Sequence, residues 1–191
     1  MTKNILLVGV GGQGTILAAK ILTLGLMEAG YDVKMSEIHG MSQRGGAVSS
    51  HVRYGAKVYS PVIERGSADV LVSFEQMEAL RWLDYMRPDS TAVVNSQSIN
   101  PVPVLVGKAL YSDKILDEIC AKVRATVLDA TAEALALGNA RALNILLVGA
   151  AAKIMKLDDI DWNGILAKNV KPAFVEINQK AFARGQELVT A

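Results

Sequence analysis

Residues 5–14 read Ile5-Leu6-Leu7-Val8-Gly9-Val10-Gly11-Gly12-Gln13-Gly14, an aliphatic run that leads directly into a glycine-rich segment. Four large aliphatic residues followed at once by glycines are typical of a strand that helices cover on both faces, as in a parallel sheet. From residue 15 to residue 29 apolar residues recur at a helical spacing, and Gly30 is a stop signal. The stretch therefore predicts a central strand, a glycine loop and a helix.

The glycines of this loop have the G-x-G-x-x-G spacing of nucleotide-binding loops, in the required place between a strand and a helix. Glycine lets a ligand approach the backbone, and the N-terminus of the following helix offers unpaired amides to an anion or a carbonyl. A binding role is therefore predicted for Gly9, Gly11, Gly12, Gln13 and Gly14. The alternative is a tight turn that only packs the helix on the sheet, although such a turn has no use for the amide of Gln13.

Taken alone, the loop suggests a dinucleotide. Glu37 lies near the end of the predicted second strand, where an acid that binds the ribose of NAD is expected. An NAD(P)-binding Rossmann oxidoreductase is therefore one hypothesis. Against it, the rest of the chain shows no recognisable catalytic acid or base and no hydride-acceptor pocket.

Strands and helices alternate through the following part of the chain. Further strands are predicted at 31–37, 48–54, 68–74, 91–95 and 125–128, and further helices at 75–86, 113–122, 132–137, 141–156, 161–170 and 172–189. Segment 57–62 is expected to complete an antiparallel hairpin or edge pair, 87–89 to form a turn, and 98–108, with Pro101 and Pro103, to leave the sheet. The pattern predicts one Rossmann-like, three-layer α/β domain over residues 1–191, with a mostly parallel sheet, an inserted hairpin or edge pair and a helical C-terminal third.

The composition of the chain excludes several classes of function. The 20 Lys and Arg residues nearly balance the 19 Asp and Glu residues, so no broad cationic face is expected for nucleic acid or anionic membranes. The longest apolar run, residues 145–152, is far shorter than the roughly 20 residues that span a bilayer. Cys120 is the only cysteine, so it closes no intrachain disulfide and builds no metal cluster alone. We expect a cytoplasmic protein without a metal site.

A second motif lies at residues 36–47, which read Ser36-Glu37-Ile38-His39-Gly40-Met41-Ser42-Gln43-Arg44-Gly45-Gly46-Ala47. The two motifs together resemble the signature of the gamma-type domain of 2-oxoacid:ferredoxin oxidoreductases. The resemblance continues through 69–71, 144–149 and 171–185 and so covers nearly the whole chain. Within that family the second motif is most similar to the indolepyruvate enzymes, in which this domain is a separate small chain.

The resemblance implies the small subunit of an oxidoreductase that converts aryl 2-oxoacids and coenzyme A to acyl-coenzyme A and reduces ferredoxin. Thiamine diphosphate and iron-sulfur clusters perform that chemistry. Each [4Fe–4S] cluster needs about four thiolates, and this chain has one cysteine and no recognisable thiamine-binding segment. We therefore expect thiamine diphosphate, Mg and the clusters in a large partner subunit and no cofactor in this chain, which should be inactive alone. Self-association is left open, and a purely structural assembly subunit is a further hypothesis.

The site is expected where the two motifs meet, at the carboxyl ends of neighbouring strands. Its members from the second motif are Ser42, Arg44, Gly45 and Gly46. A guanidinium holds a carboxylate or a phosphate with two hydrogen bonds, so Arg44 could bind the 2-oxoacid or coenzyme A. The alternative is an ion pair with Glu37 or Glu64 that only holds the loop. No residue is assigned as catalytic.

Histidine and a buried asparagine are further candidates for a polar role. The only histidines are His39 and His51, and a loop-stabilising hydrogen bond is favoured for His39 over proton transfer or metal binding. Asn144 lies in an otherwise apolar helical stretch, and a buried amide must find partners. We expect Asn144 to bond to the glycine loop or to a partner chain.

Overall fold

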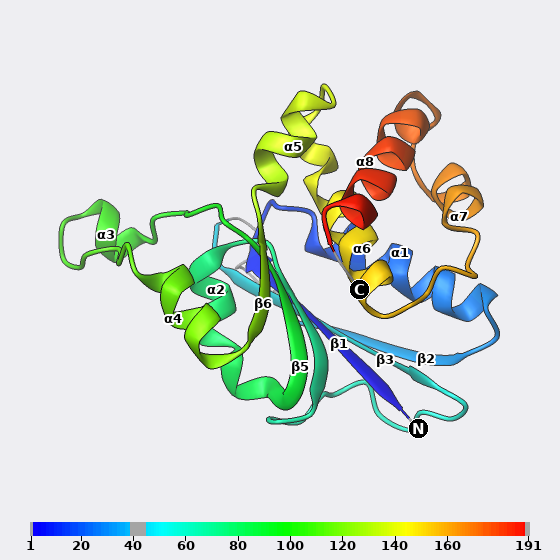
Figure 1. Ribbon diagram of the computed structural model, residues 1–191, viewed down its shortest axis with the longest axis horizontal. Helices are drawn as coiled ribbons and strands as arrows, with labels where there is room; N and C mark the ends of the chain where they lie inside the picture. Colours follow the sequence, from blue (N-terminus) through cyan, green and yellow to red (C-terminus); the bar gives the residue numbers. More distant parts are fainter. Residues whose placement is uncertain (1, 39–44, 190–191) are drawn as a thin grey trace.

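The computed structural model describes residues 2–38 and 45–189 and has a six-stranded sheet with helices on both faces (Figure 1). Across the sheet the strands follow the order β2-β3-β1-β4-β5-β6. Their bounds are β1 Lys3–Val10, β2 Asp32–Ile38, β3 Ala47–Gly55, β4 Ala68–Ser73, β5 Met86–Asn95 and β6 Arg124–Leu128. The α/β fold predicted from the sequence is confirmed.

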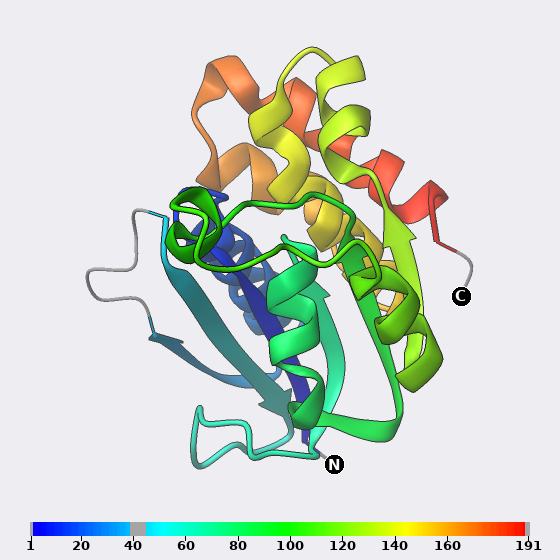
Figure 2. The ribbon, with the colours of Figure 1, turned by 90° about the vertical axis from the view of Figure 1, so that its left-hand side faces the viewer.

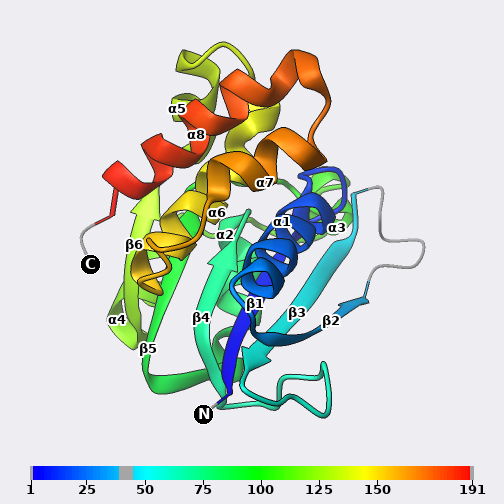
Figure 3. The same cartoon turned by 90° about the vertical axis from the view of Figure 1, so that its right-hand side faces the viewer.

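The helices form the outer layers. Helices α2 and α4 cover one face of the sheet (Figure 2), and α1, α6 and α7 cover the other (Figure 3). Their bounds are α1 Thr15–Glu28, α2 Gln76–Arg81, α3 Val102–Leu105, α4 Ile115–Lys122, α5 Ala130–Ala136, α6 Leu143–Ile154, α7 Trp162–Asn169 and α8 Val175–Glu187, with short 3-10 helices η2 Leu83–Tyr85, η3 Ala140–Ala142 and η4 Pro172–Phe174. The helical C-terminal third is therefore confirmed.

The sheet is mixed in a simple way. Strands β1, β4, β5 and β6 are parallel neighbours, while β3 runs antiparallel to both β1 and β2. The antiparallel edge pair is thus β2 with β3, and the prediction that 57–62 pairs with 48–54 is wrong. The side chain of Arg53 donates hydrogen bonds to the carbonyls of Ser60 and Val62, at 2.9 and 3.0 Å. These carbonyls are therefore not paired with the backbone of a neighbouring strand.

The prediction of a turn at 87–89 is also wrong, because these residues belong to β5. Pairing with β4 passes from Ala68 opposite Met86 to Val70 opposite Thr91, so the ladder is interrupted between them. Pro88 has no N–H to donate, and an interrupted ladder is where a strand tolerates proline. The sequence signal marked a real irregularity but not the end of the strand.

The aliphatic run of β1 is buried on both faces. Ile5 and Leu7 join the hydrophobic cluster beneath α1 and α6, whereas Leu6 and Val8 join the cluster beneath α2 and α4, and all four are fully buried. Alternate side chains of a strand point to opposite faces, so a central strand covered twice needs apolar residues at every position. β1 is therefore the fixed centre from which the glycine loop leaves.

Helices α6 and α8 approach each other at the level of their backbones. A Cβ added at Gly149 would lie 2.1 Å from the carbonyl oxygen of Phe182, and one at Gly185 would lie 1.9 Å from that of Leu146. Only glycine fits at either position. This contact fixes α8 against the buried α6 above the carboxyl ends of the strands (Figure 1).

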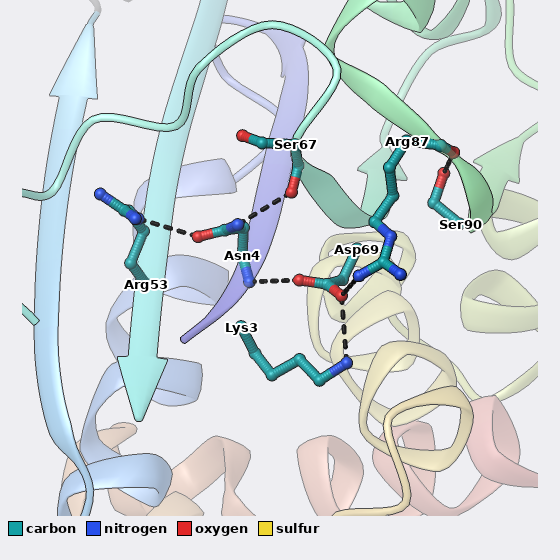
Figure 4. Close-up of polar contacts among 7 residues, drawn as sticks. All are labelled: Lys3, Asn4, Arg53, Ser67, Asp69, Arg87 and Ser90. Atoms are coloured by element: carbon teal, nitrogen blue, oxygen red, sulfur yellow. Dashed lines mark hydrogen bonds and ion pairs between the residues drawn. The ribbon is translucent and has the colours of Figure 1, made fainter. Parts of the chain in front are cut away.

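Polar side chains tie the strands together at the opposite, amino-terminal edge of the parallel strands (Figure 4). The carboxylate of Asp69 accepts hydrogen bonds from Lys3 Nζ at 3.1 Å, Arg87 Nη1 at 2.8 Å and the backbone N–H of Asn4 at 2.9 Å. The Asn4 side chain in turn accepts from Arg53 Nε at 2.8 Å. This cluster links β1, β3, β4 and β5, far from the glycine loop.

Candidate functional site

Glycine is required at different positions of the loop for different structural reasons. A Cβ at Gly9 would lie 2.8 Å from the Cβ of Phe74, and one at Gly14, whose φ is +84°, would lie 2.5 Å from Asn144 Nδ2. Both positions are closed by protein. Gly12 has a φ of +106° and no atom within 4 Å of an added Cβ, so it is the exposed position where a ligand could approach the backbone.

The amide of Gln13 is fully engaged inside the protein. Its Oε1 accepts from the N–H of Val10 at 2.8 Å, and its Nε2 donates to the carbonyl of Phe74 at 2.8 Å and to Gln97 Oε1 at 3.0 Å. The expectation that a packing turn has no use for this amide is therefore wrong. Gln13 clamps the loop onto the ends of β4 and β5.

The two sequence motifs meet through their backbones. The N–H of Gly11 donates to the carbonyl of Gly46 at 2.8 Å, and the N–H of Gly45 donates to the carbonyl of Gly11 at 3.1 Å. Ser42, Arg44 and His39 lie outside the described residues. For the part of the second motif that is described, the predicted meeting with the glycine loop is confirmed, while the binding role of all these residues stays a prediction.

A cleft of about 900 Å³ lies beside the loop. Gly12, Gln13 and Gly14 form one wall, and the start of α6 and the connection from α7 to α8 form the other. Its lining residues are Gly12, Gln13, Gly14, Leu17, Gln97, Thr131, Asn139, Ala140, Arg141, Ala142, Leu143, Asn144, Asn169, Val170, Lys171, Phe174 and Asn178. Most of this surface is apolar.

The charges of the cleft are all positive. Arg141 and Lys171 are exposed, the lining includes no carboxylate, and the described residues offer neither cation an ion-pair partner. An apolar cleft with two cations fits an organic anion. Sequence reasoning missed both residues, because only the fold brings η3 and the connection before α8 to the same cleft.

Asn144 connects the two walls of the cleft. It is buried, and its Nδ2 lies 3.4 Å from the carbonyl oxygen of Gly14. The predicted contact between this buried amide and the glycine loop is confirmed. A long hydrogen bond of this kind is weak, so the tight packing against Gly14 contributes most to the contact.

A second polar network holds the carboxyl ends of β4, β5 and β6. Asn95 is fully buried, and its Nδ2 donates to the carbonyl of Phe74 at 3.0 Å and to Thr131 Oγ1 at 3.2 Å. Its Oδ1 accepts from the N–H of Ala130 at 3.1 Å, at the start of α5. Asn95 therefore joins the end of β4 to the start of α5 beneath the loop, and both polar atoms of its amide have partners.

Two other candidates lie away from this edge. Glu37 is on β2, and β3 separates that strand from β1, so its carboxylate is not beside the glycine loop as a ribose-binding acid would be. His51 is buried in β3, where its Nδ1 accepts from the N–H of Ile63 at 3.0 Å. Burial lowers the pKa of His51, which keeps the ring neutral. Its role is to hold the chain after β3.

An α/β domain with a glycine loop on its first strand, bonded to a second glycine motif, defines a class of nucleotide-binding-like domains. Residues 4–188 match the family model of pyruvate ferredoxin/flavodoxin oxidoreductase, and the chain belongs to that family. The family resemblance given by the two motifs is thus confirmed.

Similar sequences and solved structures agree with this family assignment. The chain is 36% identical over 190 residues to the indolepyruvate oxidoreductase subunit IorB of Thermococcus kodakarensis and 37% identical to that of Pyrococcus horikoshii, each alignment covering 95% of this chain and 93% of the relative. Its fold is similar to the keto/oxoacid ferredoxin oxidoreductase gamma subunit of Geobacter sulfurreducens, with a TM-score of 0.72, 24% identity and 97% of both chains covered. A 2-oxoglutarate:ferredoxin oxidoreductase chain from Magnetococcus marinus gives a TM-score of 0.74 at 21% identity, with 31% of that longer chain covered.

Every helix among residues 2–38 and 45–189 is too short or too polar to pass through a lipid bilayer.

Proposed function

We propose that this chain is the small subunit of an indolepyruvate:ferredoxin oxidoreductase, and that a larger subunit carries thiamine diphosphate, Mg and the [4Fe–4S] clusters. The relatives named as indolepyruvate oxidoreductase subunits match the chain over nearly its whole length. A single cysteine cannot hold a cluster that needs about four thiolates. Electron transfer therefore belongs to the partner, and the isolated small chain is inactive.

The observation that carries the proposal is the backbone pairing of Gly11 with Gly45 and Gly46 beside the cationic cleft. We propose that Gly9, Gly11, Gly12, Gln13, Gly14, Ser42, Arg44, Gly45 and Gly46 form the binding site for an anionic group. The group is the carboxylate of the 2-oxoacid or a phosphate of coenzyme A. Ligands of both kinds were bound in the solved Magnetococcus marinus enzyme.

Steady-state kinetics of the reconstituted complex test this assignment. Arg44→Ala should raise KM about tenfold or more for indolepyruvate or for coenzyme A, because a lost charge-assisted, bidentate contact costs more than about 1.4 kcal/mol. The ligand whose KM rises identifies the bound group. Lys57→Ala removes an exposed cation that pairs with Asp32 at the start of β2, and it is the matched control.

Unchanged saturation by both ligands in a fully assembled Arg44→Ala complex would exclude ligand binding by this residue. Arylpyruvate oxidation by the small chain alone would contradict the division of labour between the subunits. Full activity of the larger chain alone would favour the purely structural hypothesis.

The NAD hypothesis has a separate test. Titration of the isolated chain with NAD or NADP should give no saturable binding at micromolar concentrations, because β3 lies between β1 and the strand that carries Glu37. Saturable binding would favour the dinucleotide enzyme. The single-domain organisation over 1–191, the cytoplasmic location and the absence of nucleic-acid partners stay predictions.

A further inference from the structure

A projecting segment lies between β5 and α4. We call residues 98–112 the arm. It leaves the carboxyl edge of the sheet after β5, forms the short helix α3 and returns to α4, and it extends beyond the body of the domain in Figure 1. Within the described part of the chain, no helix or strand packs extensively against α3.

The surface of the arm is apolar. Val102, Leu105, Val106 and Leu110 are 69%, 69%, 58% and 95% exposed, and Lys108 is the only charged residue between 98 and 112. Single exposed aliphatic side chains are common on soluble proteins, but four on one projecting segment form a patch of the kind that marks an interaction surface.

The arm is ordered by its own contacts. The N–H groups of Lys108 and Ala109 donate to the carbonyl of Pro103, at 2.8 and 3.1 Å, and close the tip. Both roots are held by the buried carboxylate of Glu75, which accepts from the N–H of Ile99 at 3.1 Å and from the hydroxyl of Tyr111. A segment held in one shape loses little conformational freedom on binding.

We propose that the arm inserts into an apolar groove of the larger subunit. The inference rests on the proposed function, because it requires that subunit. A convex apolar segment needs a concave apolar receptor, and the cleft of this chain carries Arg141 and Lys171, which repel the one charge of the arm, Lys108. The same cleft in a second copy is thus a poor receptor, and the groove of the larger subunit should have an acidic rim facing Lys108.

The affinity of the two subunits tests the proposal. The double variant Leu105→Ser with Leu110→Ser should weaken binding of the larger subunit about 10- to 100-fold in calorimetric titrations, since buried apolar anchors dominate such interfaces. Leu135→Ser, at a residue 64% exposed on α5, is the matched control and should change the affinity less than about twofold. Lys108→Glu should also weaken binding of the larger subunit, and the loss of affinity should be greater at low salt than at high salt.

The outcomes separate the hypotheses. Wild-type affinity of the double variant, with an unchanged circular dichroism spectrum, overturns the docking role of the arm and leaves the proposed function intact. Dissociation of a dimer of the small chain by the double variant, without effect on the larger subunit, assigns the arm to a second copy and also overturns the proposal. Failure of the wild-type chain itself to bind the larger subunit contradicts the proposed function.

Discussion

At the scale of single residues, Gly12 and Gly14 form a natural pair for comparison. Both have positive φ, but only Gly14 is in contact with another side chain, that of Asn144. Gly14→Ala should lower the free energy of unfolding by about 2–4 kcal/mol, because backbone strain of about 1–2 kcal/mol adds to a steric clash. Urea denaturation of the isolated chain measures the loss.

Gly12→Ala is the matched control and should cost only the backbone strain, about 1–2 kcal/mol. Shortening the opposing side chain in Gly14→Ala with Asn144→Ala should recover part of the loss. Equal losses at the two glycines would show that the contact with Asn144 adds nothing.

Glu78 should make the stability of the folded protein depend on pH. Its carboxylate is buried on α2, and one oxygen lies 3.1 Å from Arg81 Nη1. Burial raises the pKa of Glu78, and the neighbouring Glu75 adds to the rise. A carboxyl group whose pKa is raised on folding favours the folded state while protonated, and this contribution is lost as the pH rises above about 4.5, its ordinary pKa.

Glu78→Gln should therefore be more stable than the wild type at pH 7, and the difference should shrink as the pH falls toward 4.5. Thermal unfolding of both proteins across that range is the measurement. A constant difference at all pH values would mean that Glu78 has the same pKa in the folded and unfolded chains.

At the scale of elements, the contact between α6 and α8 depends on two glycines. Gly→Ala within a helix normally adds about 1 kcal/mol of stability. Here Gly149→Ala or Gly185→Ala should instead lower the free energy of unfolding by more than about 3 kcal/mol, because each new methyl meets a backbone carbonyl that cannot rotate away. Guanidinium unfolding followed by circular dichroism measures it, and a gain in stability at either site would exclude the close approach.

The Asp69 cluster joins strands rather than helices (Figure 4). Asp69→Ala should lower the free energy of unfolding by about 2–4 kcal/mol, because the mostly buried carboxylate serves two cations and a backbone N–H. Glu118→Ala, which removes an exposed pair with Lys122, should cost about 0.3–0.5 kcal/mol. Similar losses for the two variants in the same urea titration would contradict a structural role for the cluster.

The elements also show what sequence could and could not predict. β1, β4 and the second half of β5 were readable because burial on both faces selects nearly unbroken aliphatic runs. The order of β2 and β3 was not, since no local pattern says that a strand will insert between its two predecessors. The segment 57–62 has strand-like composition, yet its carbonyls bind Arg53 and so form no ladder.

At the scale of the whole molecule, the candidate site was predicted only in part. The glycine spacing and the order of strand and helix were sufficient to predict that Gly11 lies beside Gly45 and Gly46 at the carboxyl ends of the strands. Arg141 and Lys171 lie in distant elements without a motif, so their meeting in the cleft required the packing of α6 and α8. The clamp formed by Gln13 required the position of Phe74, which sequence could not supply.

Strand β3 sets a limit on what this scaffold can become. In dinucleotide enzymes the strand next to the first strand carries the acidic residue that binds the ribose. Here the antiparallel strand β3 occupies that position and pairs with β1 along its full length. Point substitutions around the glycine loop could not convert the chain to a nicotinamide enzyme, by evolution or in the laboratory. Such a conversion would need a whole strand excised and its neighbour re-registered.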